Sequence, residues 1–264
     1  SAASDVYKRQ GLKTLNLSDN VQKIGNSAFE NCYALTLDNK NGWLPTGLTE
    51  IGSSAFKKCK SLTKVVFGSE LTTIGVSAFE EAVQQLEETP AKPVNPSDKI
   101  NHQYYGLSEI DFTYATSLNK IGSNAFKNTN IAAIIFPEGV TALPSEVCSG
   151  SYNLKTVTAG KSLESIGSNA FMNCYQLATV TIPYSAVLDK TVFSKYAANR
   201  TMKLTVVPKI SREKADVIIG RDTELELKCL KNFTGTAFSI SDGQKDSSGN
   251  LYLSLIHISE PTRP

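Results

Sequence analysis

Ile51-Gly52-Ser53-Ser54-Ala55-Phe56 decides the fold of this 264-residue chain, because the same six-residue pattern returns along most of it. Four further copies keep the pattern closely and two keep only its spacing; they begin at Ile24, Ile74, Ile121, Ile166, Leu143 and Leu188. Successive copies start 22 or 23 residues apart, except for one step of 27 residues and one of 47. A period of this length is one supersecondary unit that cannot bury its apolar face alone, so the units are expected to stack as a solenoid. We call the pattern the hexapeptide and count positions from its first residue.

A second apolar pattern, Leu-x-x-Leu-x-Leu, lies about a dozen residues before each hexapeptide, for example at Leu12, Leu15 and Leu17. Its alternation predicts a short strand with one buried face. In the hexapeptide, the Ser or Asn at position 3 is suited to cap a one- or two-turn helix that turns Ala and Phe inward. The Gly at position 2 fits a backbone site with positive φ or a close approach to the next coil.

The fold class predicted from these two patterns is an α/β repeat. The solenoid is expected to have a parallel sheet on one wall and short helices on the other, with the recurring Ile and Phe side chains stacked in columns as a core. Neighbouring strands lie about 4.8 Å apart and helices are about 10 Å wide. The stack is therefore expected to bend toward the strands and to offer an extended concave surface.

Two segments depart from the period. The first unit is four residues longer than the usual 23, and the surplus falls in Asp38–Gly47, which holds Trp43, the only Trp. The larger departure is Glu87–Gly106, which contains three prolines within seven residues and opposes both helix and sheet. We interpret it as a loop inserted before the next strand. Long loops of this kind are functional or disordered, and the composition slightly favours disorder.

The ends of the chain fit neither the repeat nor its residue preferences. Residues 1–10 and 254–264 resemble peptides encoded by sequencing-adapter DNA, so we expect a non-native leader and tail around a fragment of a longer protein. Residues 11–207 are then the solenoid, with the insertion at 87–106. Residues 208–253 alternate apolar and polar side chains around Leu225–Cys229 and Phe238–Ile240, which predicts the opening strands of a partial β-sandwich.

Composition excludes several classes of protein. The formal net charge is +2 with 20% charged residues, without the basic excess of a nucleic-acid-binding protein. No apolar run approaches the roughly 18 residues of a membrane-spanning helix. No cofactor-binding motif is present, so neither a nucleic-acid partner nor a cofactor is expected.

The residues that usually carry catalysis or bind metals are sparse. The two histidines, His102 and His257, lie in the insertion and in the suspect tail. Cys32, Cys59 and Cys174 share position 9 with Ala82 and Thr129 of other repeats, which indicates a small packing slot and favours buried thiols. The alternative for Cys32 and Cys59 is a disulfide, which requires that their Cα atoms lie within about 7 Å of each other. With no Cys-x-x-Cys pair, no metal site and no enzyme are predicted.

The open face of the predicted sheet is the candidate site. It would present side chains that lie between the buried strand positions, with Val66 and Ile135 as an exposed apolar patch. Tyr104 and Tyr105, at the end of the insertion, would add aromatic contacts. A solvated, Thr-rich β-surface is an equally good interpretation of the same residues. The candidate contact residues are Lys64, Val66, Glu109, Asp111, Ile135, Thr156, Thr158, Thr179, Thr181, Tyr104 and Tyr105.

The extended phrase Ile-Gly-x-x-Ala-Phe-x-x-Cys-x-x-Leu is complete at Ile24–Leu35, Ile51–Leu62 and Ile166–Leu177. It resembles the BspA-type leucine-rich repeat of bacterial surface proteins, and a truncated immunoglobulin-like module after the repeats is similar to their layout. The resemblance implies an extracellular or cell-surface, non-catalytic adhesion module that binds a protein, with host extracellular-matrix or other surface glycoproteins as the candidate class. The alternative is a structural spacer that projects another domain from the cell.

Overall fold

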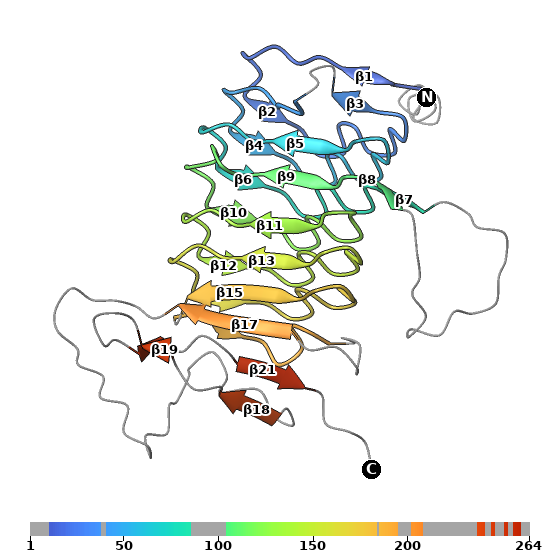
Figure 1. Ribbon diagram of the computed structural model, residues 1–264. Coiled ribbons are helices and arrows are strands. Elements are labelled where there is room, and N and C mark those ends of the chain that lie inside the picture. Colours follow the sequence, from blue (N-terminus) through green and yellow to red (C-terminus); the bar gives the residue numbers. More distant parts are fainter. Residues whose placement is uncertain are drawn as a thin grey trace, which may run out of the picture.

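The computed structural model describes residues 11–37, 41–85, 104–183, 185–194, 202–207, 237–240, 244–245, 251–252 and 256–259. Between residues 11 and 207 they form coils stacked one above the other (Figure 1). We number the coils 1 to 7 by their hexapeptides, which begin at Ile24, Ile51, Ile74, Ile121, Leu143, Ile166 and Leu188. The predicted parallel solenoid is confirmed.

Each coil carries two short strands, where the sequence predicted one. The first column follows the Leu-x-x-Leu-x-Leu pattern and holds β1 (Thr14–Leu15), β3 (Thr36–Leu37), β5 (Lys64–Val66), β9 (Glu109–Asp111), β11 (Ala133–Ile135), β13 (Thr156–Thr158), β15 (Thr179–Pro183) and β17 (Met202–Val207). The second column ends at position 1 of each hexapeptide and holds β2 (Lys23–Ile24), β4 (Glu50–Ile51), β6 (Thr73–Ile74), β10 (Lys120–Ile121), β12 (Ala142–Leu143), β14 (Ser165–Ile166) and β16 (Val187–Leu188). The pairs within both columns are parallel and in register, as between Val157 and Val180.

The predicted short helices are absent from the described residues, where the hexapeptides form turns instead. The reason is a left-handed residue at every fourth position. In coil 2, Ser54 at position 4 and Lys58 at position 8 have φ of 55° and 63°, and most other coils repeat this pair. A residue with positive φ ends a right-handed helix, so no second turn can form.

These turns hydrogen-bond to the next coil as strands do. Ser27, Phe29 and Asn31 donate their backbone N–H groups to coil 2 at 2.8–2.9 Å, and later coils repeat the pattern. Both walls are therefore spaced by backbone hydrogen bonds. The expected bend toward the strands rested on wide helices on the outer wall, so its physical cause is missing.

The core consists of aromatic columns, as the sequence predicted. Phe29, Phe56, Phe79 and Phe126 stack with ring centroids 5.2, 5.2 and 5.7 Å apart. The column resumes with Phe171 and Phe193 at 5.9 Å. A second column of rings, Phe67, Phe112 and Phe136, follows the first strands. Phe56, Phe79 and Phe126 are fully buried, whereas Phe29 in coil 1 is half-buried.

Glycine at position 2 permits close approach of the coils, one of the two predicted reasons. A Cβ on Gly75 would lie 2.5 Å from the backbone N of Ser53 and 2.6 Å from the carbonyl carbon of Gly52. The N–H of this residue also donates to position 1 of the preceding coil, as from Gly75 to Ile51 at 2.7 Å. Coil 5 has Pro144 here, which has no N–H and a bulkier ring. Both strand columns are interrupted at this junction, because β9 and β10 are not paired with β11 and β12.

All five ion pairs of the described residues join adjacent coils. Lys57 lies 2.9 Å from Glu80 on the outer wall, where both side chains are largely buried. A hydrogen bond from Lys57 lowers the pKa of the Glu80 carboxyl against its desolvation. Such pairs contribute little stability singly, but they oppose a shift of one coil against the next.

The strand before the insertion pairs with the strand at its end. β7 (Val83–Gln85) pairs antiparallel with β8 (Tyr104–Gly106), so the last residues of the predicted loop are a strand. Beyond β17, the first-column sheet continues antiparallel with β21 (Ile256–Ser259) and β18 (Ala237–Ile240), while β19 (Gln244–Lys245) pairs with β20 (Leu251–Tyr252). The strand expected near Phe238 is thus β18, and the one near Leu225–Cys229 lies outside the described residues.

Candidate functional site

The outward face of the first-column strands, which we call the sheet face, carries nine of the eleven predicted contact residues. Because side chains alternate along a strand, the first and third residues of each three-residue strand point outward. Parallel pairing in register, interrupted between β9 and β11, places them in two rows. One row runs through Lys64, Glu109, Ala133, Thr156 and Thr179, and the other through Val66, Asp111, Ile135, Thr158 and Thr181.

The upper part of the sheet face, over coils 3 and 4, is charged and internally paired. Lys64 Nζ lies 2.5 Å from Glu109, and this hydrogen bond raises the pKa of the Lys64 ammonium. Asp111 accepts a hydrogen bond from the Thr113 backbone N–H at 2.8 Å. The pKa of its carboxyl is lowered mainly by a hydrogen bond from the Thr113 side chain, and further by this backbone N–H. The ion pair and the hydrogen bonds from Thr113 hold these charges in place on the sheet face.

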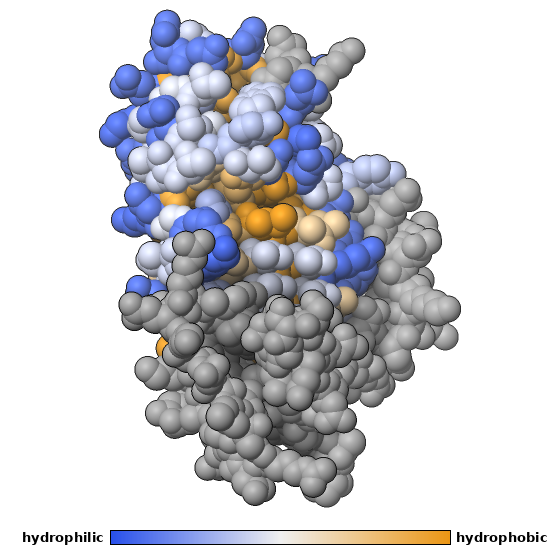
Figure 2. Space-filling view, turned by 60° about the vertical axis from the view of Figure 1, so that its left-hand side comes forward, coloured by the Kyte–Doolittle hydropathy of each residue, from blue (hydrophilic) through white to orange (hydrophobic). Residues whose placement is uncertain are grey.

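The middle of the sheet face is apolar. Ile135 keeps 66% of its surface exposed, more than any other large hydrophobic residue that the structure describes. Ala133, two residues earlier on the same strand, is also exposed. Apolar surface is visible at mid-height of the described stack, between hydrophilic residues (Figure 2). The predicted exposure of Ile135 is confirmed.

The lower part of the sheet face is a grid of hydroxyls. Thr156 pairs with Thr179 and Thr158 with Thr181, and all four are half-buried. Their methyl groups and hydroxyls offer a contact surface that is neither charged nor strongly apolar. The same grid satisfies the strand preference of Thr, so its presence alone does not identify a ligand.

The predicted exposure of Val66 is wrong, because its side chain is only 3% exposed. The extra residues of coil 2 bring Trp43 back beside β5, where Trp43 pairs with Val66. The Trp43 ring meets the ring of Tyr114 from coil 4, with centroids 5.0 Å apart. These two aromatic residues, which the sequence did not single out as contacts, take the place of Val66 on the sheet face. The signal was available in the longer first unit that holds the only Trp.

The tyrosines of the insertion lie away from the two rows. β7 and β8 project from the edge of the stack (Figure 1). Tyr105 is 50% exposed, and the side chain of Tyr104 lies outside the described part of the structure. The two residues are thus placed beside the sheet face and not on it.

The four cysteines of the described residues are buried, as predicted. Cys32, Cys59, Cys148 and Cys174 are thiols that form no disulfide with one another, and none has exposed surface. At position 9, Cys59 donates to the Phe29 carbonyl and Cys174 to the Cys148 carbonyl of the preceding coil, each at 3.2 Å. Burial raises the pKa of Cys59 and of Cys174 to about 12, so both are unreactive thiols.

No metal-binding or membrane-spanning element occurs in the described residues. They hold no group of three or more His, Cys, Asp or Glu side chains that could bind a metal ion. Over the same part of the chain, no helix has the length and apolarity needed to cross a bilayer. His102 lies outside the described residues, and His257 is a backbone member of β21.

The comparisons with known proteins agree with this architecture. A family model for the BspA-type leucine-rich repeat region matches residues 3–91 and 98–204 in six copies. No curated protein sequence matches the chain.

Several solved structures are similar to the chain. The leucine-rich repeat protein of T. pallidum is 28% identical, with 63% of this chain and 65% of that chain covered and a TM-score of 0.47. A leucine-rich repeat protein of Bacteroides ovatus is 16% identical, with 74% and 62% covered and a TM-score of 0.31. The pneumococcal vaccine antigen PcpA is 15% identical, with 74% and 62% covered and a TM-score of 0.32. This chain spans less than two thirds of the length of each of the three.

Proposed function

The chain belongs to the BspA-type leucine-rich repeat family, and on that premise we propose that its solenoid is a non-catalytic, protein-binding module of a secreted or surface-attached protein. Leucine-rich repeats are generally protein-interaction modules. The ligand we propose is an extracellular-matrix or other surface glycoprotein, bound through the sheet face. No covalent step is involved.

The observation that carries the proposal is the exposure of Ile135 in the middle of the sheet face. A side chain of this size that is 66% exposed gains about 1–2 kcal/mol when a partner covers it. It lies between the paired charges of coils 3 and 4 and the threonines of coils 6 and 7. This arrangement, an apolar centre with a polar surround, is that of protein interfaces.

The aromatic pair on coils 2 and 4 adds a second contact area to the sheet face. Tyr114 is 52% exposed and is backed by Trp43, so its ring is held at low conformational cost. Tyr and Trp are enriched at interfaces because they bury large area with few rotatable bonds. The contact residues proposed are therefore Ile135 and Tyr114 as the apolar and aromatic contacts, with Glu109, Asp111 and the four threonines as polar contacts.

The test is binding of the chain to immobilised fibronectin, laminin and collagen, measured by biolayer interferometry. Ile135→Glu removes the apolar contact and buries a charge, and should weaken binding at least tenfold. Val187→Glu is the matched control, because Val187 is an exposed aliphatic residue (42%) on β16 of the second column. Equal affinities for wild type and Ile135→Glu, or equal losses in both variants, would remove the sheet face as the binding surface. Absence of binding to all three proteins would exclude this ligand class.

The alternative function, a spacer that projects another domain, has one observation in its favour. Coil-to-coil hydrogen bonds on both walls make the stack a stiff element. The two functions differ in what the sheet face does. A spacer tolerates Ile135→Glu without loss of adhesion by the intact protein, and a binding module does not.

A further inference from the structure

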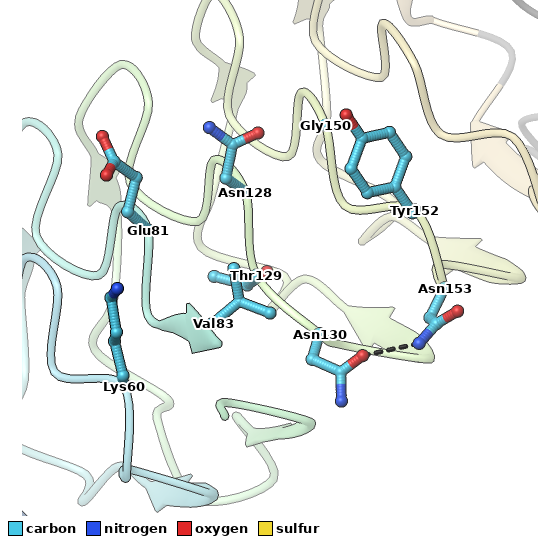
Figure 3. A pocket seen from close by; sticks show the side chains of 9 residues that line it. All are labelled: Lys60, Glu81, Val83, Asn128, Thr129, Asn130, Gly150, Tyr152 and Asn153. Carbon is cyan, nitrogen blue, oxygen red and sulfur yellow. Dashed lines mark hydrogen bonds between the residues drawn. The ribbon is translucent and has the colours of Figure 1, made fainter. Parts of the chain in front are cut away.

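A concave surface lies at the edge of the stack, away from the sheet face. It is an open pocket of about 320 Å³, at the lower end of the roughly 300–1,000 Å³ typical of small-ligand sites. The pocket sits where the chain returns from the hexapeptides to the next strands (Figure 3). Its lining residues are Lys60, Glu81, Val83, Asn128, Thr129, Asn130, Gly150, Tyr152 and Asn153.

Three departures from the repeat meet in this pocket and create it. The chain leaves coil 3 at Val83 for the insertion, so this coil has no ordinary return segment. In coil 4 the buried residue after the hexapeptide, Ile131, lies at position 11, whereas the equivalent residue of other coils lies at position 12. The wall is therefore one residue shorter at Asn130. Coil 5 has Gly150 at position 8, and a Cβ there would collide with Oδ1 of Asn128. Irregularities that converge on one place from three coils are more typical of a functional site than of random drift.

An aromatic platform and a row of amides form one end of the pocket. The ring of Tyr152 stacks on Tyr175 with centroids 5.5 Å apart and planes at 7°, yet Tyr152 keeps 37% of its surface exposed. Beside it, Asn153 Nδ2 donates to Asn130 Oδ1 at 2.6 Å, and Gln176 Nε2 donates to Asn153 Oδ1 at 3.0 Å. Each amide in this ladder is held in a fixed orientation by its neighbour. The amides can form further hydrogen bonds to a ligand, because a side-chain amide has two N–H donors and an oxygen that accepts two bonds.

The opposite end of the pocket holds one charge of each sign (Figure 3). Lys60 Nζ lies 5.4 Å from the centroid of the Tyr33 ring, and Glu81 lies 3.7 Å from Lys58. The lining has no net charge, so it does not favour a strongly anionic or cationic ligand. It combines an apolar ring face with many hydrogen-bonding groups.

We propose that this pocket binds an uncharged saccharide. A pyranose ring has an apolar C–H face that fits an aromatic ring and a rim of hydroxyls that pair with amides and charged groups. A peptide strand is the less suitable occupant, because the coil backbones around the pocket are already bonded to one another on both walls. The site is independent of the sheet face, and its test leaves the proposed protein binding untouched.

The test is saturation-transfer NMR of the full chain with maltose, cellobiose, lactose and N,N′-diacetylchitobiose. At least one disaccharide should bind with a dissociation constant of about 1 mM, and Tyr152→Ala should weaken it about tenfold. Tyr152→Phe keeps the ring and should bind within about threefold of wild type. Tyr114→Ala, which removes an exposed tyrosine from the sheet face, is the matched control and should leave saccharide binding unchanged.

Three results would overturn the proposal. These are no transfer to any of the four sugars, equal loss in Tyr152→Ala and Tyr114→Ala, or undiminished binding by Tyr152→Ala. Transfer to acetyl-tetra-alanine amide but to none of the sugars would identify a peptide site instead. Circular dichroism melting of each variant separates loss of binding from loss of fold, and Tyr152→Phe reports on the platform even if Tyr152→Ala is unstable.

Discussion

Substituting glycine at position 2 of two hexapeptides tests the close approach of the coils. Gly75→Ala and Gly25→Ala are the same change at the same position of the repeat, and the sequence alone predicts the same effect. In the structure, a Cβ on Gly75 would lie 2.5 and 2.6 Å from backbone atoms of coil 2, whereas a Cβ on Gly25 has nothing within 4 Å. The two variants should therefore differ.

The expected magnitude follows from the contacts. Ordinary contacts of a Cβ begin near 3.4 Å, so coils 2 and 3 must separate by nearly 1 Å to accept the methyl group of Gly75→Ala. Overpacking of this kind costs about 1–3 kcal/mol. Lengthening the 2.7 Å hydrogen bond from Gly75 to Ile51 adds about 1 kcal/mol. Gly75→Ala should lower the free energy of unfolding by about 2–4 kcal/mol, and Gly25→Ala should change it by less than about 1 kcal/mol, in the stabilising direction.

Urea unfolding followed by far-ultraviolet circular dichroism measures both variants against wild type. The m-value must be compared as well, because a stack of coils can lose cooperativity when one interface is weakened. Equal midpoints for Gly75→Ala and wild type would refute the argument from coil spacing. A loss in Gly25→Ala as large as that in Gly75→Ala would refute it too, since that result would make glycine a requirement of local backbone conformation.

Other perturbations test the core, the turns and the thiols. Phe79→Ala removes a buried ring that stacks on both neighbouring coils and should cost about 3–5 kcal/mol in urea unfolding, whereas Phe29→Ala, at a half-buried ring, should cost about half as much. Equal costs would contradict the stacked column. Lys58→Gly should raise the free energy of unfolding by about 1 kcal/mol, because a side chain is strained at the φ of 63° that Lys58 adopts. The substitution loses little else, since the ion pair of Lys58 with Glu81 at 3.7 Å is exposed. A destabilised variant would show that the left-handed turn carries no strain. Burial raises the pKa of Cys59 and Cys174 to about 12 in the folded chain, whereas the pKa of a thiol in the unfolded chain is about 8.5. The unfolded state therefore loses these protons first as the pH rises. The free energy of unfolding falls above about pH 8.5 as a result. Between pH 8 and 10 each thiol accounts for about 2 kcal/mol of that loss, which Cys59→Ala or Cys174→Ala should remove; an unchanged pH dependence in both would indicate ionisable thiols in the native state.

The core of the fold was predictable because its signal is local and repeated. Position 6 of the hexapeptide carries Phe in coils 1 to 4, and stacking of identical units places these rings in one column without further information. Burial of the cysteines followed in the same way, from a position that also accepts Ala82 and Thr129. The glycine at position 2 likewise indicated a close approach of neighbouring coils.

The helices were predicted wrongly because the pattern of apolar residues does not report the sign of φ. The spacing of Ala and Phe fits a helical turn, and Ser or Asn before them fits a cap. Asn31, Asn128 and Asn173 at position 8 did carry a signal, since Asn adopts left-handed conformations more readily than most residues. Lys58 and Glu81 at the same position obscured it. Their conformation is imposed by hydrogen bonds to the neighbouring coil, which a single repeat cannot reveal.

The sheet face was predicted in outline, and it departs from the prediction where residues distant in sequence meet. Strand alternation correctly placed Ile135 outward. It also placed Val66 outward, but the surplus residues of coil 2 bring Trp43 beside that side chain. The edge pocket was missed for a similar reason, because its three causes lie in different coils and each looks like a minor irregularity when taken alone.

In the proposed complex, a protein ligand covers the sheet face around Ile135. Hydroxyl-radical footprinting of the chain with and without an immobilised matrix protein that it binds tests this most directly, because exposed Ile and Tyr side chains oxidise in proportion to their accessibility. Oxidation of Ile135 and Tyr114 should fall in the complex, while that of Val76 on the outer wall and Tyr33 at the coil edge should not change. Protection of Val76 or Tyr33 with Ile135 still oxidised would contradict binding through the sheet face.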